Sequence, residues 1–478
     1  MDTFDLLVIG GGINGAAIAR DAAIRGASVL LVEKDDLAGH TSSASSKLIH
    51  GGLRYLEYGQ IRLVAEALRE RETLLRTAPH VVRPLRFVLP EAEGMRPRWL
   101  IRAGLLLYDL LSIRGSLPRS RRIRRGGAEL GAPLRDRRRL LTYWDAWADD
   151  SRLTLLNAVD AAENGAEIAT RTALLSARRE GEHWRATLSD GRQVAARAIA
   201  NAGGPWVSDV LVRLGQTSRD HARLVKGSHI VVPALWEGEH GYILQQPDGR
   251  VVFALPFEGS FTLIGTTDIP VELPEDARIS PDEIIYLCEA AGRYFTAPVV
   301  PGDVVWSYSG IRALHDDGRA DAKAVTRDYH LELEAHPGPK LLSVFGGKIT
   351  TARALAQKAV DMLGIDGRRS TGWRMLPGGD VYPAFVEWLG RLGLWMPAPM
   401  VLRLSRAYGT RLKDMIGDAS RLEDLGRHYG AGLYERELQW LVAQEYARSA
   451  EDVLWRRTKL GLHMSAAERD AVRERMGG

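Results

Sequence analysis

The stretch DLLVIGGGINGAAIARDAAIRGASVLLVE, residues 5–33, decides the fold of this chain. Residues 4–9 form a short apolar run typical of a buried strand, and residues 10–15 follow as a glycine-rich turn. Small residues at 16–25 predict a helix, and residues 28–32 predict a second strand that ends at Glu33. The pattern indicates a strand–helix–strand unit, which opens a Rossmann-like α/β domain.

Three glycines in this turn predict a bound dinucleotide. Gly10 permits the tight turn, Gly12 lets the backbone approach a pyrophosphate, and Gly15 lets the helix pack closely on the strand. N–H groups at the start of the helix favour phosphate, and the carboxylate of Glu33 can accept hydrogen bonds from a ribose. The other cofactor contacts expected from this unit are Ile13, Asn14 and Lys34.

The residues that follow favour FAD over NAD. No second dinucleotide fingerprint of similar quality occurs, and a stretch rich in hydroxyl groups follows the first one. Its side chains can bind phosphate, and we expect cofactor contacts from Thr41, Ser42, Ser43, Ser46 and Lys47. Gly51 and Gly52 would let the backbone lie near a flat ring system, and His50 is expected beside the flavin.

Composition narrows the class of protein. The chain has 478 residues, 45% of them hydrophobic and 26% charged, as in soluble globular proteins of several domains. Its one cysteine, Cys288, excludes an internal disulfide and a thiolate-rich metal site, so we expect no metal and a cytoplasmic location. A net charge of +4 is too small to indicate nucleic-acid binding.

The order of motifs predicts three domains. A discontinuous FAD-binding domain is assigned to residues 1–75, 150–215 and 335–370. An inserted β-rich substrate-binding domain takes residues 76–149 and 216–334, including the basic segment 96–125, and a helical C-terminal domain takes residues 375–478. A β-rich insertion commonly supplies one wall of a ligand cleft.

Motifs along nearly the whole chain resemble those of FAD-dependent glycerol-3-phosphate dehydrogenases of the aerobic, respiratory type, within the D-amino-acid-oxidase-like flavoproteins. They include SSASSKLIHGGLRYLE at 42–57, NAGGPW at 201–206, KGSHIVVP at 226–233, IGTTD at 264–268, YSGIR at 308–312, TRDY at 326–329, SVFGGKITTAR at 343–353 and LWRRTKLG at 454–461. One departure is Ala202-Gly-Gly204, where the family usually has alanine-threonine-glycine. The resemblance implies further cofactor contacts at Gly203, Gly347, Lys348 and Thr350.

The resemblance also implies a reaction. Glycerol 3-phosphate would be oxidised at C2 to dihydroxyacetone phosphate, with hydride transfer to flavin N5 and electrons passed on to a membrane quinone. The implied location is the inner face of the cytoplasmic membrane, with peripheral or monotopic attachment, and a homodimer is an implied option. Residues 99–113 fit an interfacial helix, and equally an ordinary core helix.

A phosphorylated alcohol needs cationic donors and a base. The expected cations are Arg54, Arg312, Arg327 and Lys348, because arginine matches phosphate geometry and a lysine at a helix start suits an anion. We expect His229 to accept the hydroxyl proton, with His50 as the alternative, and Arg54 and Arg312 to assist catalysis. Tyr55 and Thr267 are expected hydrogen-bond partners, and Asp268 could orient a cation or cap a turn.

Three other functions stay open at this point. A glycerol-3-phosphate oxidase that uses oxygen would carry the same motifs. An oxidase or dehydrogenase of small amines or amino acids would share the fold but need fewer cations. A flavin-bound sensor or scaffold would bind FAD without turnover.

Overall fold

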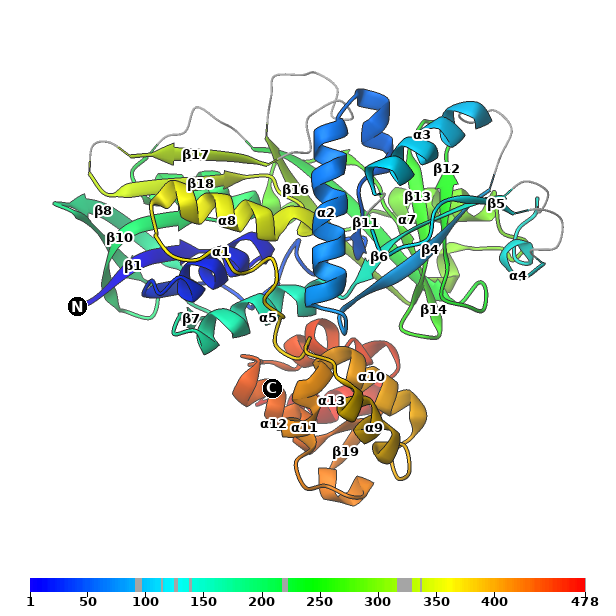
Figure 1. Cartoon of the computed structure of the whole chain (residues 1–478). Coiled ribbons are helices and arrows are strands. Elements are labelled where there is room, and N and C mark those ends of the chain that lie inside the picture. Colours follow the sequence, from blue (N-terminus) through cyan, green and yellow to red (C-terminus); the bar gives the residue numbers. More distant parts are fainter. Residues whose placement is uncertain are drawn as a thin grey trace.

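The computed structural model describes residues 1–90, 97–112, 115–123, 128–136, 140–216, 222–315, 329–335 and 338–477. Its described strands form one sheet of eight strands, one of ten and a two-stranded hairpin, and a helical domain lies beneath the two large sheets (Figure 1). This arrangement confirms the predicted class: an α/β cofactor domain, an inserted β-rich domain and a helical C-terminal domain.

The first sheet is built from distant parts of the chain. Its order is β17-β18-β10-β1-β2-β7, and β9 joins β10 to β8. The strand bounds are β1 Asp2–Ile9, β2 Val29–Val32, β7 Glu167–Ala169, β8 Leu174–Glu180, β9 His183–Leu188, β10 Gln193–Asn201, β17 His330–Glu334 and β18 Lys340–Phe345. β1 runs parallel to both β10 and β2, as the opening motif predicts.

Helices cover one face of this sheet. They are α1 (Ile13–Ile24), α5 (Asp150–Glu163) and α8 (Ala352–Leu363), and their alanine-rich faces pack on Leu6, Val8 and Leu31. The small side chains of α1 allow this close approach, because a bulkier residue would hold helix and sheet apart. On the other face, α6 (Val207–Arg213) packs with Trp184 of β9.

The second sheet has the order β15-β11-β14-β13-β12-β4-β6-β3, with β16 paired to β11 and β5 to β6. Its strands are β3 Leu48–Ile49, β4 Val82–Pro90, β5 Arg121–Ile123, β6 Leu140–Ala148, β11 Ala222–Pro233, β12 Gly241–Gln245, β13 Val251–Phe257, β14 Phe261–Gly265, β15 Ile269–Pro270 and β16 Trp306–His315. Helix α7 (Pro281–Gly292), which carries the buried Cys288, packs on one face. The other face meets α2 (Ile61–Thr77) and α3 (Arg98–Leu111).

Two strands cross the domain boundaries expected from sequence. β3 belongs to the second sheet, although its residues fall in the first segment, 1–75. β17 belongs to the first sheet, although its residues precede position 335. Short edge strands of this kind are set by pairing with a distant neighbour, which local composition does not reveal.

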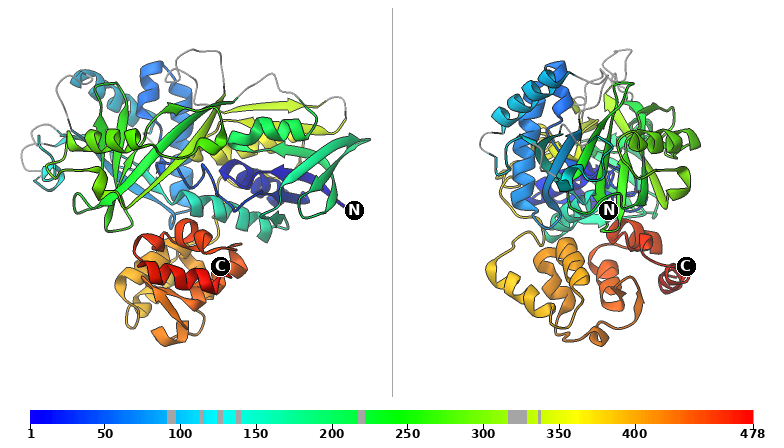
Figure 2. Two further views of the ribbon diagram at one scale, coloured as in Figure 1. Left: turned by 180° about the vertical axis from the view of Figure 1, so that it is seen from behind. Right: turned by 90° about the vertical axis from the view of Figure 1, so that its right-hand side faces the viewer.

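The C-terminal domain lies under the junction of the two sheets in all three views (Figures 1 and 2). Its core is formed by α9 (Pro383–Leu392), α10 (Ala398–Tyr408), α11 (Leu412–Ile416), α12 (Glu435–Gln444) and α13 (Ala466–Arg475). A small hairpin of β19 (His428–Gly430) and β20 (Leu433–Tyr434) interrupts the helices. None of the described helices combines the length and apolarity that a membrane-spanning segment requires.

Candidate active site

A cavity of about 840 Å³ lies between the glycine-rich turn and the second sheet. Its walls come from the start of α1, the loop at 38–46, the 3₁₀-helix η1 (Leu53–Tyr58), α3 and residues 346–350. This volume is at the large end of the range for ligand sites in proteins, as a dinucleotide with a small substrate requires.

Glycines let the backbone approach this cavity closely. Gly10 has a φ of +109°, and a Cβ on it would come within 2.5 Å of the carbonyl oxygen of Ala202. A Cβ on Gly15 would lie 1.9 Å from the carbonyl oxygen of Gly10, so this glycine is required for packing of α1 against the turn. Gly12 is the N-cap of α1, and the hydroxyl of Ser42 accepts a hydrogen bond from the N–H of Ile13 at 2.9 Å.

The carboxylate of Glu33 lies at the end of β2 beside this turn. It accepts hydrogen bonds from the N–H of Gly11 at 2.6 Å and from the N–H of Asp35 at 2.9 Å. Burial raises the pKa of Glu33, although both hydrogen bonds act in the opposite direction. Each carboxylate oxygen retains a lone pair with which a ribose hydroxyl can bond.

The second sheet supplies the opposite wall through strand register. Gly227 pairs with Gly310, and Val225 pairs with Arg312, in the antiparallel ladder of β11 and β16. Because side chains alternate between the two faces of a strand, Gly227, His229, Gly310 and Arg312 share one face, and all four line the cavity. The missing side chain of Gly227 leaves room for Arg312, and that of Gly310 leaves room for the backbone of Ala44.

The guanidinium of Arg312 is held in place by neighbouring oxygen atoms. It forms an ion pair with Asp268 and donates to the hydroxyl of Thr266 at 3.1 Å. The side chain keeps 25% of its surface exposed, toward the cavity that it lines. Asp268 therefore orients a cation, one of the two roles that the sequence left open for it.

Two more cations line the same cavity. Arg54 on η1 has an Nε atom that is buried and has no hydrogen-bond partner among the described residues. The ammonium of Lys348 lies 3.8 Å from the ring centre of Tyr55, which also lines the cavity. A buried donor without an acceptor is costly, and a ligand oxygen in the cavity would remove that cost at Arg54.

A family model described as FAD dependent oxidoreductase matches residues 5–353, and one described as the C-terminal domain of alpha-glycerophosphate oxidase matches residues 369–476. The chain belongs to the FAD-dependent oxidoreductases. Together the two matches cover most of the chain, and they confirm FAD as the cofactor and the resemblance inferred from the motifs.

Several curated dehydrogenases are similar to this chain over nearly their whole length. The D-erythritol 1-phosphate dehydrogenase of Brucella abortus is 49% identical over 99% of this chain and 97% of its own. The glycerol-3-phosphate dehydrogenase of Pseudomonas aeruginosa is 48% identical over 98% of this chain and 94% of its own. The aerobic glycerol-3-phosphate dehydrogenase of Escherichia coli is 44% identical over 99% of this chain and 97% of its own. The solved glycerol-3-phosphate dehydrogenase from Bacillus halodurans, complexed with FAD, has a TM-score of 0.74 and 25% identity over 99% of this chain and 94% of that chain.

The residues at the turn fit FAD on their own chemistry. The side-chain amide of Asn14 donates to the carbonyl of Gly346 at 3.1 Å, and its Oδ1 is buried with no partner among the described residues. Gly347 has a φ of +100°, and a Cβ there would lie 2.7 Å from Asn14 Nδ2. The site thus offers a cofactor an unused acceptor and a closely approaching backbone.

Most of the expected cofactor contacts line the cavity. These residues are Gly10, Gly12, Ile13, Asn14, Glu33, Lys34, Thr41, Ser42, Ser46, His50, Gly52, Gly203, Gly347, Lys348 and Thr350. The hydroxyl of Thr41 donates to the carbonyl of Ile311 at 2.7 Å, and the Tyr308 hydroxyl donates to the carbonyl of Ser45 at 2.9 Å. These bonds fix the 41–46 loop of the flavoenzyme against β16.

The structure corrects the expectation that Lys47 contacts the cofactor. Its side chain is 1% exposed and does not line the cavity, and its ammonium bonds Asp150 at 2.7 Å and the carbonyl of Ser43 at 3.1 Å. The lysine therefore neutralises the buried carboxylate at the start of α5, a partner that is 103 residues away in sequence.

Four other expected residues, Gly15, Ser43, Gly51 and Thr267, do not line the cavity. Thr267 is buried, where it donates to Glu283 at 2.7 Å, and its neighbour Thr266 lines the cavity instead. The hydroxyl of Ser43 donates to the carbonyl of His40 at 3.1 Å, and the N–H of Gly51 donates to Tyr108 at 2.8 Å. Arg327 lies outside the residues that the structure describes.

Both candidate histidines line the cavity, in different settings. His229 is 2% exposed, stacks on Tyr308 with ring centres 4.9 Å apart, and shares a hydrogen bond of 2.9 Å between its Nε2 and Ser46 Oγ. Burial, with Arg312 and Lys47 nearby, holds the pKa of His229 well below its usual range, so the ring is neutral at pH 7. His50 is half-buried and lies between buried residues just before η1.

Sequence reasoning missed the inner face of α3 as a wall of the flavoenzyme cavity. Leu100, Ile101, Gly104 and Leu107 line it, at the helical spacing of one face. The spacing was visible in the sequence, but it does not distinguish a helix that covers a ligand from one that covers a core.

Proposed function

We propose that this enzyme oxidises sn-glycerol 3-phosphate at C2 to dihydroxyacetone phosphate and passes the electrons to a membrane quinone. The observation that carries the proposal is the set of cations, Arg54, Arg312 and Lys348, that lines one cavity with the glycine-rich turn. A phosphate dianion needs two or three such donors, whereas a lone carboxylate needs fewer. The names of relatives 44–48% identical support the same substrate.

The cations bind and orient the substrate. Arg312, held by Asp268 and Thr266, offers its remaining N–H groups to the phosphate, and Arg54 Nε supplies a second donor. Holding the alcohol in one orientation removes most of the entropic cost of bringing the C2–H bond to the oxidant. When bound, FAD would supply that oxidant as a hydride acceptor.

The hydroxyl proton has to leave as the carbonyl forms. We assign its acceptance to the neutral His229, whose Nε2 faces the Ser46 hydroxyl in the cavity wall. His50, which lines the same cavity, is the alternative. Arg312 stabilises the negative charge that develops on the substrate oxygen, because a fixed cation acts strongly in a partly dry site.

The apolar surface of α3 supports a lipid-soluble acceptor. Trp99, Leu106 and Leu110 are 71%, 61% and 55% exposed on one side of the helix, and Leu100, Ile101 and Leu107 line the cavity. An interfacial helix with these properties would bring the cavity to the lipid headgroups, on the inner face of the cytoplasmic membrane. The description of the C-terminal family model, which names an oxidase, favours molecular oxygen as the second candidate acceptor.

A second candidate substrate is D-erythritol 1-phosphate. The relative with that name is 49% identical, which is as similar as those named for glycerol 3-phosphate. Both compounds present a phosphate and an alcohol that can be oxidised, so the cations described above serve either one.

The test is anaerobic mixing of the yellow holoenzyme with each polyol phosphate in a stopped-flow spectrometer. We expect rapid bleaching of the flavin by glycerol 3-phosphate, and faster reduction by D-erythritol 1-phosphate would assign the other substrate. Adding a quinone analogue without oxygen, or oxygen with peroxide detection, then identifies the acceptor. Flavin that no polyol phosphate reduces would contradict the proposal.

A further inference from the structure

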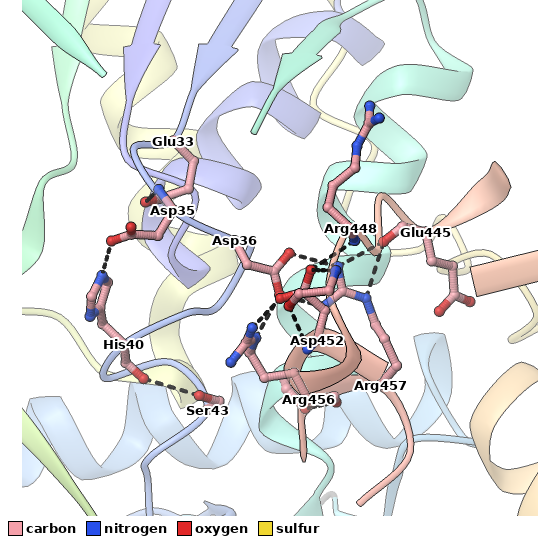
Figure 3. A network of polar contacts seen from close by, with 12 residues as sticks. Glu33, Asp35, Asp36, His40, Ser43, Glu445, Arg448, Asp452, Arg456 and Arg457 are labelled. Atoms are coloured by element: carbon pink, nitrogen blue, oxygen red, sulfur yellow. Dashed lines mark hydrogen bonds and ion pairs between the residues drawn. The ribbon is translucent and has the colours of Figure 1, made fainter. Parts of the chain in front are cut away.

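The C-terminal domain contacts the back of the cofactor-binding loop through buried charges (Figure 3). Asp36, three residues after Glu33, is 2% exposed. Its carboxylate accepts hydrogen bonds from Arg457 Nη1 at 2.7 Å and Nη2 at 2.8 Å, and from Arg456 Nε at 2.6 Å. Both arginines belong to the π-helical segment η8 (Asp452–Arg457) of the C-terminal domain.

The same short loop also forms the cofactor side of the cavity. Glu33, Ala38 and Gly39 line it, on either side of Asp36. The N–H of Ala38 donates to the carbonyl of Gly11 at 3.1 Å, and the N–H of Gly11 donates to Glu33. A shift of Asp36 would therefore move both the ribose-binding carboxylate and the glycine-rich turn.

The arginines are themselves held in fixed positions. Arg457 also donates through Nη2 to the carbonyl of Glu445 at 2.8 Å, and Arg456 forms an ion pair with Asp452. Asp452 accepts hydrogen bonds from Arg171 at 2.8 Å and from the N–H of Ser449 at 2.9 Å. Arg171 in turn donates its backbone N–H to the carbonyl of Asp35 at 2.8 Å, which closes the network on the cofactor loop.

A second anchor reaches the loop that carries Ser46. Lys459 forms an ion pair with Asp149 and bonds the hydroxyl of Ser151 at 2.8 Å. Asp150 lies between these two residues. Its carboxylate accepts hydrogen bonds from the N–H and the hydroxyl of Ser45, at 3.1 and 2.7 Å. The C-terminal domain thus contacts the loop at residues 33–39 directly and is linked to the loop at residues 41–47 through the start of α5.

We propose that the C-terminal domain retains FAD in this enzyme, with Arg457 as a positioning residue that acts through Asp36. The bidentate pair holds residues 33–39 against the turn, so release of the cofactor requires the pair to open. The inference rests on FAD binding and is independent of the substrate proposed above.

A purely structural role for the interface would give a different result. Breaking a buried charge pair leaves an uncompensated charge and lowers stability wherever the pair lies. Retention of FAD, by contrast, depends only on pairs that touch the cofactor loop. The two roles are separated by the rate of FAD release measured well below the unfolding temperature.

The experiment compares holoenzyme variants by the fluorescence of released FAD, with apoprotein titrations giving the dissociation constant. We expect Arg457→Met and Asp36→Asn each to speed release at least tenfold, and the double variant to release no faster than the single variants. Arg411→Met is the control for loss of an interdomain ion pair away from the cofactor loop, because Arg411 pairs with the half-exposed Glu163 at the far end of α5. Its release rate should stay within twofold of the parent.

Two results would overturn the proposal. One is release from Arg457→Met that is as slow as from the parent, and the other is equal acceleration in Arg411→Met. If Arg457→Met is not recovered in folded form, Arg457→Lys supplies the same comparison, since it keeps the charge and removes the bidentate geometry. We expect Arg457→Lys to release FAD at a rate between those of the parent and Asp36→Asn.

Discussion

Gly227 leaves the space that the guanidinium of Arg312 occupies: a Cβ on Gly227 would lie 2.3 Å from Arg312 Nη2. The two residues lie on one face of neighbouring strands, and both line the cavity. The glycine in KGSH therefore sets the position of the Arg312 guanidinium in the cavity wall.

Gly227→Ala is expected to raise KM for the polyol phosphate about 10- to 100-fold, because displacing Arg312 removes a charge-assisted contact of about 1.5–3 kcal/mol. The FAD content should not change. Steady-state kinetics and the flavin-to-protein ratio measure the two effects. Gly292→Ala is the matched control, since a Cβ there meets nothing within 4 Å; an unaltered KM in Gly227→Ala would remove Arg312 from the phosphate site.

His229→Asn is expected to slow flavin reduction by about 10²- to 10⁴-fold, the usual contribution of a general base. The rate is measured by anaerobic stopped flow at saturating substrate. His183→Asn on β9 serves as the control, because His183 is not among the residues that line the cavity. If His50→Asn is slow and His229→Asn is not, the base is His50.

Replacing the exposed apolar side chains of α3 should weaken membrane attachment. Trp99→Ser with Leu106→Ser is expected to reduce binding to anionic vesicles at least tenfold, because each apolar side chain buried in lipid contributes about 1.5–3 kcal/mol. Co-sedimentation measures the effect. Leu175→Ser, at a 50% exposed position on β8, is the control; equal losses in both proteins would place the membrane contact elsewhere.

Stability should fall as the pH is lowered from 7 to 5. Burial, assisted by the charge of Arg152, lowers the pKa of His80 to about 3, whereas the unfolded chain has a value of about 6.5. Between these values the unfolded state binds more protons, so acid favours unfolding by about 2 kcal/mol at pH 5. Urea unfolding of the parent and of His80→Gln measures the difference, and identical pH dependence in both would contradict the assignment.

The cofactor half of the site was largely accessible from sequence, because its chemistry lies in contiguous turns. Gly10, Gly12 and Glu33 fall within one motif whose spacing is fixed by the strand–helix–strand unit. Local spacing suffices there, since the residues that meet in space also lie close along the chain.

The substrate half of the site was harder to predict from sequence, because it depends on pairing between distant strands. Thr267 was expected at the substrate, but Thr266 lines the cavity instead. A shift of one residue along an extended chain reverses the face on which a side chain lies. Lys47 was expected at a phosphate because its partner, Asp150, approaches only in the folded chain. The docking of Arg457 on Asp36 leaves no local pattern at all, as the two residues are 421 positions apart.

The position of β18 beside β10 has a practical consequence for dissecting this protein. Residues 198–201 of β10 pair with residues 340–343 of β18. The first sheet is therefore complete only when a strand from late in the chain has been added. A fragment that stops before residue 340 would expose the unpaired backbone of β10 as an open edge, which invites aggregation. A cut in the connection between α8 and α9, after residue 364, leaves the strands of that sheet together.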